Sequence, residues 1–428
     1  MTYVTDICYP KDKLFGTASF NPLIPKNLQH IDPTPVDTQA PLSCIARGGY
    51  YIVQNKIFRH KVSAMQHATR LGIKPQDVIW VFNDNEYDSI NWEDPVHTPL
   101  WMLYRMRAQQ LREKYDYLVL SFSGGGDSTN VLDSFILNNI RLDEVMCYWP
   151  KRYTSGKYKA SRNTNAENFV SEWDYLIEPK LQWLRTTAPN TKITILDPHE
   201  HLSDQEPNED FFKLTTRHSY LGLQRFQAVD DLLLLRQMAY KNCALITGVN
   251  PPIPIRVNRH FMISFEDSVP AMYGPDFTDK GLYRNVECFY WTPDLPEIAS
   301  AQAHALLDDL RVHPQFVDFL PEWSIGGDKK RIRDLKKNQH LRRWIKSVLY
   351  PTYDHTALQV DKNTSPIYQP EWYAWFYNNA ESKEILQAHD SAVAAHQNMI
   401  DPGFFISRDN AVHDYYCYRK LYHVGDLL

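Results

Sequence analysis

Glycine and cysteine are scarce in this chain, and long apolar runs are missing. Glycine accounts for 16 of the 428 residues, so three glycines in a row stand out. The six cysteines are widely spaced and form no CxxC pair, which argues against a zinc ribbon, a dithiol redox site and a compact disulfide framework. No apolar run reaches the ~18 residues of a membrane span, and the first residues do not resemble a secretory signal. We therefore expect a cytoplasmic protein with reduced thiols and no membrane contact.

The chain also lacks an excess of positive charge. Its 46 lysines and arginines face 51 aspartates and glutamates, which gives a formal net charge of −5. A nucleic-acid partner would therefore need a local basic patch. With 428 residues the chain exceeds the usual size of one hydrophobic core, so we expect several units. They are an N-terminal extension with an arm, a hairpin and helices (1–108), an α/β domain (109–297) and a mainly helical C-terminal domain (298–428).

Short apolar runs alternate with segments of helix length between residues 115 and 260. This alternation predicts a parallel α/β sheet, doubly wound by helices through right-handed crossovers. The runs that we expect to form its strands are 117–122, 144–148, 192–196, 244–247 and, as a fifth, 261–265. The helices that we expect around them are 127–138, 166–184 and 223–241.

The flanking units have patterns of their own. Before the sheet, residues 49–58 predict a hairpin that turns at 55–56, and a helix over 61–71 is expected to end at Gly72. Further elements expected there are a strand over 77–82 and a helix over 99–114. After the sheet, the expected helices are 298–310, 329–349 and 370–395. The expected fold class is therefore α/β, with an N-terminal α+β extension and a mainly helical C-terminal unit.

The segment Ser123–Ser128, SGGGDS, lies where a buried parallel strand is followed by a helix. Its glycines allow a tight turn that aims several N–H groups at one point, with no Cβ to keep an anion away. The positive end of the following helix points to the same place. The hydroxyls of Ser123 and Ser128 can donate to phosphate oxygens, while Asp127 can hold Mg²⁺ or cap the helix. The segment therefore predicts a pyrophosphate cradle.

Two other phosphate-binding motifs are excluded at this position. The segment lacks the GK[ST] ending of a Walker A loop. It also lacks the G-x-G-x-x-G spacing of a dinucleotide fingerprint. A glycine-rich turn with a helix-capping Asp127 is the alternative interpretation without a ligand.

The run LVLSFSGGGDS (118–128) resembles the SGGxDS signature of the PP-loop, or N-type ATP pyrophosphatase, superfamily, which includes asparagine synthetase, GMP synthetase and PAPS reductase. Every signature position matches. A second feature is similar: these families often carry T-G-x-N after the fourth strand, and this chain has Thr247, Gly248 and Asn250 there. The His-plus-acid form of that loop is absent. The resemblance covers about 115–260.

The resemblance implies a HUP-type sheet that binds ATP and Mg²⁺, with Asp127 as a metal ligand and the adenine near Met146–Trp149. It also implies that a carboxylate or carbonyl acceptor, a small molecule or a nucleobase, is adenylated with release of pyrophosphate. Ammonia or an amine then displaces AMP. The nitrogen would come from free ammonia, an amine or a separate glutaminase, because Thr2 stands where asparagine synthetase carries its cysteine nucleophile. The implied nucleotide-binding residues are Ser121, Ser123, Gly124, Gly125, Gly126, Asp127, Ser128, Tyr148, Thr247 and Gly248.

Cleavage between the α and β phosphates needs cations near the leaving pyrophosphate. Arg256 follows the fourth strand closely and is expected with Asp127 at the catalytic edge of the sheet, although an exposed loop arginine is an equal alternative. Several PP-loop amidating enzymes draw a phosphate-binding lysine from their C-terminal part, and by this resemblance we expect Lys329, or its neighbour Lys330, in that role. Lys329 opens a basic stretch, 329–346, for which a solvated helix face and a nucleic-acid contact are alternative interpretations.

Two other functions remain open from the sequence. Sulfur transfer or PAPS-type reduction would use the same cradle, but such enzymes usually carry CxxC pairs, and this chain offers only single candidates in Cys147 and Cys417. A non-catalytic protein that binds an adenine nucleotide would keep the cradle without turnover. The sequence identifies no acceptor and leaves the choice between a monomer and a homo-oligomer open.

Overall fold

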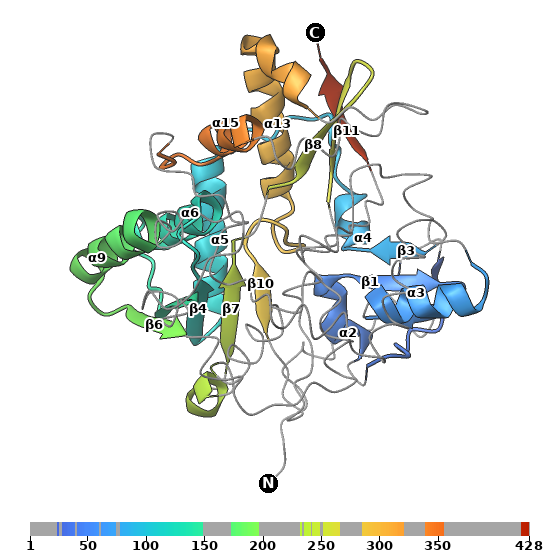
Figure 1. Ribbon diagram of the computed structural model, residues 1–428, viewed down its shortest axis with the longest axis horizontal. Coiled ribbons are helices and arrows are strands. Elements are labelled where there is room, and N and C mark those ends of the chain that lie inside the picture. Colours follow the sequence, from blue (N-terminus) through green and yellow to red (C-terminus); the bar gives the residue numbers. More distant parts are fainter. Residues whose placement is uncertain are drawn as a thin grey trace, which may run out of the picture.

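The structure of the chain is a computed structural model (Figure 1). It describes residues 24, 28–38, 41–59, 61–73, 78–148, 173–196, 232, 235–240, 242–248, 251–265, 285–320, 339–354 and 421–427. These residues form three β-sheets with helices around them. None of the described helices is both long enough and apolar enough to span a membrane.

A parallel five-stranded sheet carries the segment Ser123–Ser128 at one of its edges. Its strands are β4 (Tyr117–Ser121), β5 (Glu144–Tyr148), β6 (Lys192–Leu196), β7 (Cys243–Thr247) and β10 (Val286–Cys288). They are ordered β10-β7-β4-β5-β6, and every neighbouring pair is parallel. The predicted α/β class is thus confirmed. Because the chain adds β5 and β6 on one side of β4 and β7 and β10 on the other, the strand order reverses between β4 and β7.

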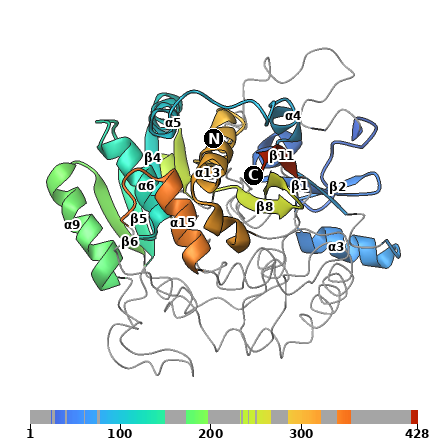
Figure 2. The ribbon, with the colours of Figure 1, turned by 90° about the horizontal axis from the view of Figure 1, so that it is seen from above.

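Both faces of this sheet are covered. Successive residues of a strand point to opposite faces. Leu120 belongs to the main hydrophobic cluster, together with residues of α5 (Leu100–Lys114) and α6 (Gly126–Ile136). Val119 packs in a separate cluster that includes Leu232. Figure 2 shows α6 lying next to these strands. A strand buried on both faces explains the continuous apolar run in its sequence.

The N-terminal part folds as a small antiparallel sheet with a helix packed on it (Figure 1). The elements are β1 (Tyr50–Val53), β2 (Lys56–Phe58), α3 (Lys61–Arg70) and β3 (Ile79–Val81), flanked by the short helices α2 (Leu42–Ile45) and α4 (Asp84–Tyr87). The predicted hairpin and helix are confirmed. The turn lies one residue earlier than predicted, at 54–55, because Gln54 takes the left-handed conformation with φ 53°.

A third sheet shows that one strand prediction was wrong. Residues 261–265 do not supply the fifth parallel strand, because most of them belong to β9 (His260–Ser264), which pairs antiparallel with β8 (Ile253–Val257) and with β11 (Tyr422–Asp426). The reason is the two-residue turn at 258–259, since only antiparallel strands can be joined by so short a connection. The fifth parallel strand is β10.

Two described helices follow the parallel sheet. α13 (Glu297–Val312) and α15 (Gln339–Leu349) pack against each other, and α13 also packs against α5. The predicted helix over 298–310 is confirmed, and the described part of the predicted helix over 329–349 is helical. The predicted helix over 370–395 lies outside the described residues.

One hydrophobic cluster runs through all three expected units. It contains buried side chains from Tyr51 in the small N-terminal sheet to Leu427 beyond β11. The expected boundary after residue 108 falls inside α5, and the boundary after residue 297 falls inside the first turn of α13, which packs on that same helix. The division into 1–108, 109–297 and 298–428 stays a prediction, and the described packing crosses both boundaries.

A buried group of ion pairs fixes the end of β10. Oε2 of Glu287 lies 2.8 Å from Arg107 and 3.1 Å from Arg47, while its Oε1 lies 2.7 Å from Nζ of Lys114. Both arginines also contact Asp294. Burial alone would raise the pKa of Glu287, but the three cations lower it well below its usual range. The buried carboxylate is therefore charged and balances cations from two other parts of the chain.

Replacing Glu287 by Gln is expected to lower the free energy of unfolding by about 3–5 kcal/mol, because buried Arg107 would lose its closer acidic partner and keep the longer, 3.4 Å contact with Asp294. Denaturant unfolding measures this change. The matched control is Glu113→Gln on the exposed side of α5, which should shift the free energy by less than about 0.5 kcal/mol.

The same variant makes a prediction about pH. Because the folded-state pKa of Glu287 is lowered, its stabilisation is present above the unfolded-state pKa of about 4.3 and is lost as pH falls from there through the folded-state pKa. The wild type should therefore lose more stability than Glu287→Gln as the pH falls below about 4. Equal acid sensitivity of the two proteins would contradict the role given to this carboxylate.

Candidate functional site

The segment Ser123–Ser128 forms a fixed turn between β4 and α6 at the carboxyl edge of the parallel sheet. Gly124 has a φ of 72°, and a Cβ at this position would lie 2.7 Å from Cγ1 of Ile177, so only glycine fits here. Gly125 is the N-cap of α6, with φ −72° and ψ 159°, an extended conformation that any residue can adopt. The turn brings the amino end of α6, whose first N–H groups have no partner within the helix, to the edge of the sheet.

The hydroxyls of two serines hold this turn together. The N–H of Ser123 donates to Oγ of Ser128 at 3.2 Å, and the Ser128 hydroxyl donates to the carbonyl of Gly125 at 3.2 Å. The two hydroxyl oxygens are 3.3 Å apart. Ser128 is buried. Both serines therefore shape the loop, and the phosphate contacts expected of them stay predictions.

Thr247 and Gly248 lie directly beside this loop. Thr247 is the last residue of β7 and pairs in register with Ser121, the last residue of β4. A Cβ at Gly248 would lie 2.5 Å from Cγ2 of Val131 and 3.0 Å from the backbone oxygen of Asp127. The two sequence motifs thus meet where the strand order reverses, which is where open α/β sheets bind their ligands.

The Asp127 carboxylate faces a lysine from α15. Its Oδ2 lies 2.9 Å from Nζ of Lys346, and the hydroxyl of Tyr350 donates to its Oδ1 at 2.7 Å. The side chains of Asp127 and Lys346 are only 13% and 18% exposed. Burial, and then the nearby Asp127 charge, raise the pKa of Tyr350, so its hydroxyl stays a neutral donor. The N-cap of α6 is Gly125, so the interpretation of Asp127 as the capping residue is wrong.

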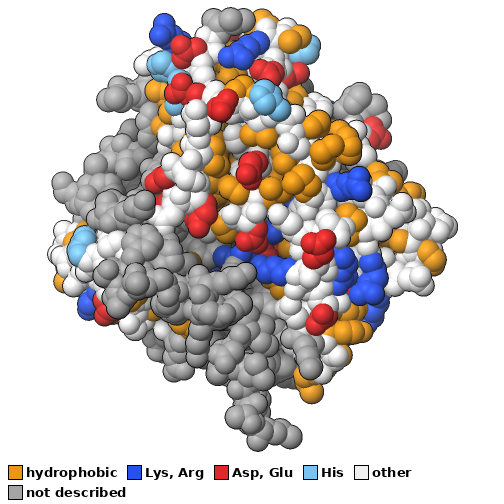
Figure 3. Space-filling model, turned by 180° about the vertical axis from the view of Figure 1, so that it is seen from behind, with side chains coloured by type: hydrophobic (Ala, Val, Ile, Leu, Met, Phe, Trp, Pro, Cys, Tyr) orange, Lys and Arg blue, Asp and Glu red, His pale blue; other side chains and the backbone are white. Residues whose placement is uncertain are grey.

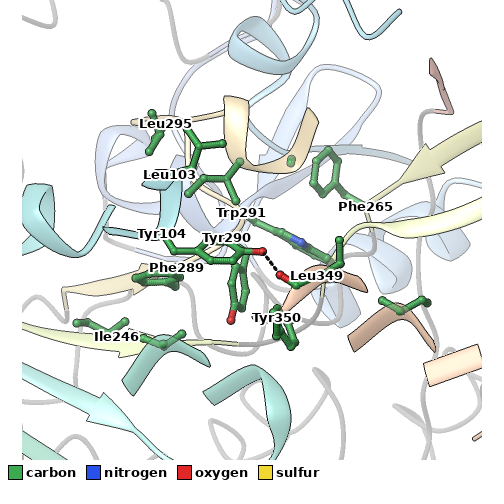
Figure 4. Close-up of a cluster of buried hydrophobic side chains, with 14 of the residues drawn as sticks. Leu103, Tyr104, Ile246, Phe265, Phe289, Tyr290, Trp291, Leu295, Leu349 and Tyr350 are labelled. Carbon is green, nitrogen blue, oxygen red and sulfur yellow. Dashed lines mark hydrogen bonds between the residues drawn. The ribbon is translucent and has the colours of Figure 1, made fainter. Parts of the chain in front are cut away.

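Aromatic packing fixes the end of α15 (Figure 4). Tyr104 of α5 donates its hydroxyl to the carbonyl of Leu349 at 3.1 Å, the dashed line of the figure. Tyr290 stacks on Tyr350 with ring centroids 5.6 Å apart. The hydroxyl of Tyr290 also donates to the backbone oxygen of Asp127 at 2.8 Å. The same tyrosines therefore join α15 to α5 and to the start of α6.

The segment that follows α15 contacts α6 at a second residue, Asp133. Asp133 accepts from Lys180 of α9 (Glu178–Thr187) at 2.6 Å and from the hydroxyl of Thr352 at 2.7 Å. Figure 2 shows α15 next to α6. The residues that follow α15 are thus attached to α6 at Asp133 as well as at Asp127.

Of three other predicted residues, Arg256 lies elsewhere, and the side chains of the other two are outside the described residues. Arg256 lies on β8, in the separate antiparallel sheet, with its guanidinium 3.8 Å from the carboxylate of Asp318. Tyr148 ends β5 at the same sheet edge as Ser121, but its side chain is outside the described residues. Lys329 lies outside them as well. The roles of these three residues stay predictions.

Lys346 and Tyr350 were not singled out from the sequence. Lys346 belongs to the basic stretch 329–346, in which Lys329 was the expected phosphate ligand. The signal that could have found both residues is their spacing: they stand four apart, so they project from the same side of the end of a helix.

The arrangement offers binding groups of both signs. A carboxylate oxygen suits a hard cation such as Mg²⁺. The ammonium group of Lys346 and the amino end of α6 suit phosphate oxygens. In the described state the carboxylate of Asp127 and the ammonium group of Lys346 neutralise each other. A ligand with its own metal ion and its own negative charge can replace this pair, because the metal suits the carboxylate and the negative charge suits the lysine.

The described cysteines do not resemble activated nucleophiles. Burial raises the pKa of the Cys147 and Cys243 thiols to about 12 and that of Cys288 to about 11. A thiol must lose its proton to attack or to carry sulfur. These three residues are therefore unsuited to sulfur transfer, and Cys417 lies outside the described residues.

No protein-family model matches the chain, and no curated protein matches it either. The functional assignment therefore depends on the site itself and on the resemblance of its sequence motifs.

Proposed function

We propose that this chain is a PP-loop ATP pyrophosphatase with a HUP-type sheet. It adenylates a carboxylate or carbonyl acceptor with release of pyrophosphate, and ammonia or an amine then displaces AMP. The observation that carries the proposal is the meeting of both motifs, Ser123–Ser128 and Thr247–Gly248, on neighbouring parallel strands where the strand order reverses.

In this proposal the loop and the amino end of α6 bind the phosphates through backbone N–H groups. Asp127 would hold Mg²⁺, which would supply positive charge to screen the triphosphate and the leaving pyrophosphate. Lys346 moves from the carboxylate of Asp127 to the pyrophosphate oxygens, where negative charge develops as the α–β bond breaks. Adenine would lie beside β5, near Tyr148.

The ion pair between Lys346 and Asp127 makes Lys346 less accessible to a nucleic acid, whose contact is one interpretation of the basic stretch 329–346. Lys346 is largely shielded and paired with Asp127, whereas Arg342 on the same helix is exposed. The described part of the stretch therefore divides between the loop and the surface. A protein that binds ATP without turnover is the second candidate, and the products formed from ATP distinguish it from the first.

Incubated with α-labelled ATP, Mg²⁺ and a pooled extract of small metabolites, the full chain is expected to form AMP and pyrophosphate. The reason is that the loop supports cleavage between the α and β phosphates, and chromatography of the labelled products measures it. Asp127→Asn should be slower by roughly tenfold or more and should need more Mg²⁺, because the metal loses an anionic ligand.

ADP and phosphate as stoichiometric products would overturn the proposed mechanism. ATP binding without any product would favour the non-catalytic candidate. An Asp127→Asn protein with the wild-type rate and the wild-type Mg²⁺ requirement would leave Asp127 with a structural role only. The mass of a labelled adduct in the same reaction would identify the acceptor.

A further inference from the structure

Two histidines and an aspartate gather where β9 and β11 pair, away from the parallel sheet. His260 of β9 and Asp426 of β11 are direct partners in the antiparallel ladder. His423 and Asp426 are three residues apart, so a regular strand would point them to opposite faces. The register shifts between His423 and Gly425, and this bulge brings both side chains to the same face.

The nitrogen and oxygen atoms of these residues face one another. Nδ1 of His260 lies 2.6 Å from Oδ1 of Asp426, and Nε2 of His423 lies 3.6 Å from the same oxygen. One ligand atom from each of the three residues falls within 4.8 Å of the others. Two ligands of a tetrahedral zinc ion, each about 2.1 Å from the metal, are about 3.4 Å apart, and the two described separations of 2.6 and 3.6 Å lie on either side of this value.

The far side of the His423 ring is oriented by a carboxylate. Its Nδ1 lies 3.0 Å from Oε1 of Glu93. A hydrogen bond there places the ring proton on Nδ1 and leaves a lone pair on Nε2. That Nε2 atom is buried and has no hydrogen-bond partner among the described residues. A lone pair and a carboxylate oxygen of Asp426 therefore face each other, an arrangement that a cation between them would stabilise.

We propose that His260, His423 and Asp426 bind a divalent transition-metal cation of the zinc class. Imidazole and carboxylate are the ligand types that Zn²⁺ prefers, and metal-bound histidines usually donate their other ring N–H to an oxygen, as His423 does to Glu93. Binding requires Nδ1 of His260 and Oδ1 of Asp426 to move apart from their 2.6 Å contact. Mg²⁺ is unsuited to this set, because it prefers oxygen ligands and an octahedral shell.

The bound ion would join β11 to β9 and, through Glu93, to the segment after α4. Figure 3 shows histidine, acidic and basic side chains gathered at the upper end of the face that it presents. Three protein ligands leave a fourth position for water or another small ligand. The inference is independent of the proposed ATP site, which lies at the edge of the parallel sheet.

Zn²⁺ titration of the full chain by calorimetry tests the proposal. The wild type is expected to bind one Zn²⁺ more than His260→Ala or His423→Ala. Glu93→Gln should keep the stoichiometry but weaken this binding by about 10–100-fold, because the ring loses its orienting partner. Asp426→Asn keeps the side-chain shape and should also lose the ion, and it serves if an alanine variant does not fold. Mg²⁺ should not bind at this site.

The matched control is His313→Ala. His313 also pairs with an aspartate, with its Nδ1 3.1 Å from Oδ1 of Asp309. Among the described residues, this pair does not belong to a group of three possible metal ligands. It should bind as many Zn²⁺ ions as the wild type. Equal stoichiometry and affinity in the wild type, His423→Ala and Asp426→Asn would overturn the proposal, and so would an equal loss in His313→Ala.

Discussion

Lys346→Met is expected to lower the rate of AMP and pyrophosphate formation by about 100–1,000-fold, the usual effect of removing one group that stabilises charge in the transition state. The substitution keeps most of the side-chain length and removes only the ammonium group that faces Asp127. ATP affinity should fall less than the rate, because the backbone N–H groups of the loop remain. The rate at saturating Mg²⁺-ATP, measured with the labelled-ATP assay, gives the effect.

Arg342→Met is the matched control for this variant. It removes one positive charge from the same helix, but from an exposed position, so the rate should stay at the wild-type value. An equal loss of rate in the two variants would assign the effect to the overall positive charge of α15. A nucleic-acid contact would depend on that overall charge in the same way. An unchanged rate in a folded Lys346→Met protein would leave the lysine as a structural partner of Asp127.

Gly125→Val is expected to lower ATP affinity by about 100-fold or more. The loss of two hydrogen bonds to charged phosphate oxygens, at about 1.5–3 kcal/mol each, is enough to lower the affinity by this factor. The backbone of Gly125 has an extended conformation, so valine adds a side chain at the loop without backbone strain. Gly124 would be a poorer choice, because its φ of 72° makes any substitution there a test of folding. Calorimetric titration with Mg²⁺-ATP measures the affinity.

Gly72→Ala provides the opposite control. Gly72 has a φ of 66° and open space around it, so alanine should cost about 1–2 kcal/mol of stability through backbone strain alone. ATP affinity should not change, because the residue follows α3 in the N-terminal part. If Gly125→Val bound ATP as the wild type does, the loop would be an ordinary turn and the proposed function would fail.

The buried strands were the most predictable part of the fold. The runs at 144–148 and 192–196 form β5 and β6 with the predicted limits. Continuous apolar runs of this length have few alternatives once helices cover both faces of the sheet. The helix expected over 99–114 was equally clear, because Pro99 suits a helix start and α5 begins at the next residue.

The strands β10 and β8 were missed for different reasons. β10 has only three residues and contains Glu287, whose charge is balanced by Arg47 and Arg107. These two ion pairs could not be predicted from the residues next to Glu287 in the sequence. β8 contains Pro254, which usually argues against a strand, yet β8 is an edge strand, where proline is tolerated.

The candidate site divides in the same way. The loop and Thr247–Gly248 could be predicted from local motifs, because the residues of each motif are adjacent in the sequence. The contact between Asp127 and Lys346 could not, because it depends on how α15 docks through Tyr290 and Tyr350. Tertiary packing, not local sequence, brings Lys346 beside the loop.

The ion pairs around Glu287 also determine how the chain can be divided. A fragment that started after residue 108 would keep this buried carboxylate and discard Arg47 and Arg107, two of its three cations. The cost of a buried charge without its partners exceeds what most surface contacts return. The N-terminal segment and the parallel sheet should therefore unfold together, as one cooperative unit. An excised nucleotide-binding fragment would keep Lys114 as the one cation of the three beside the buried carboxylate.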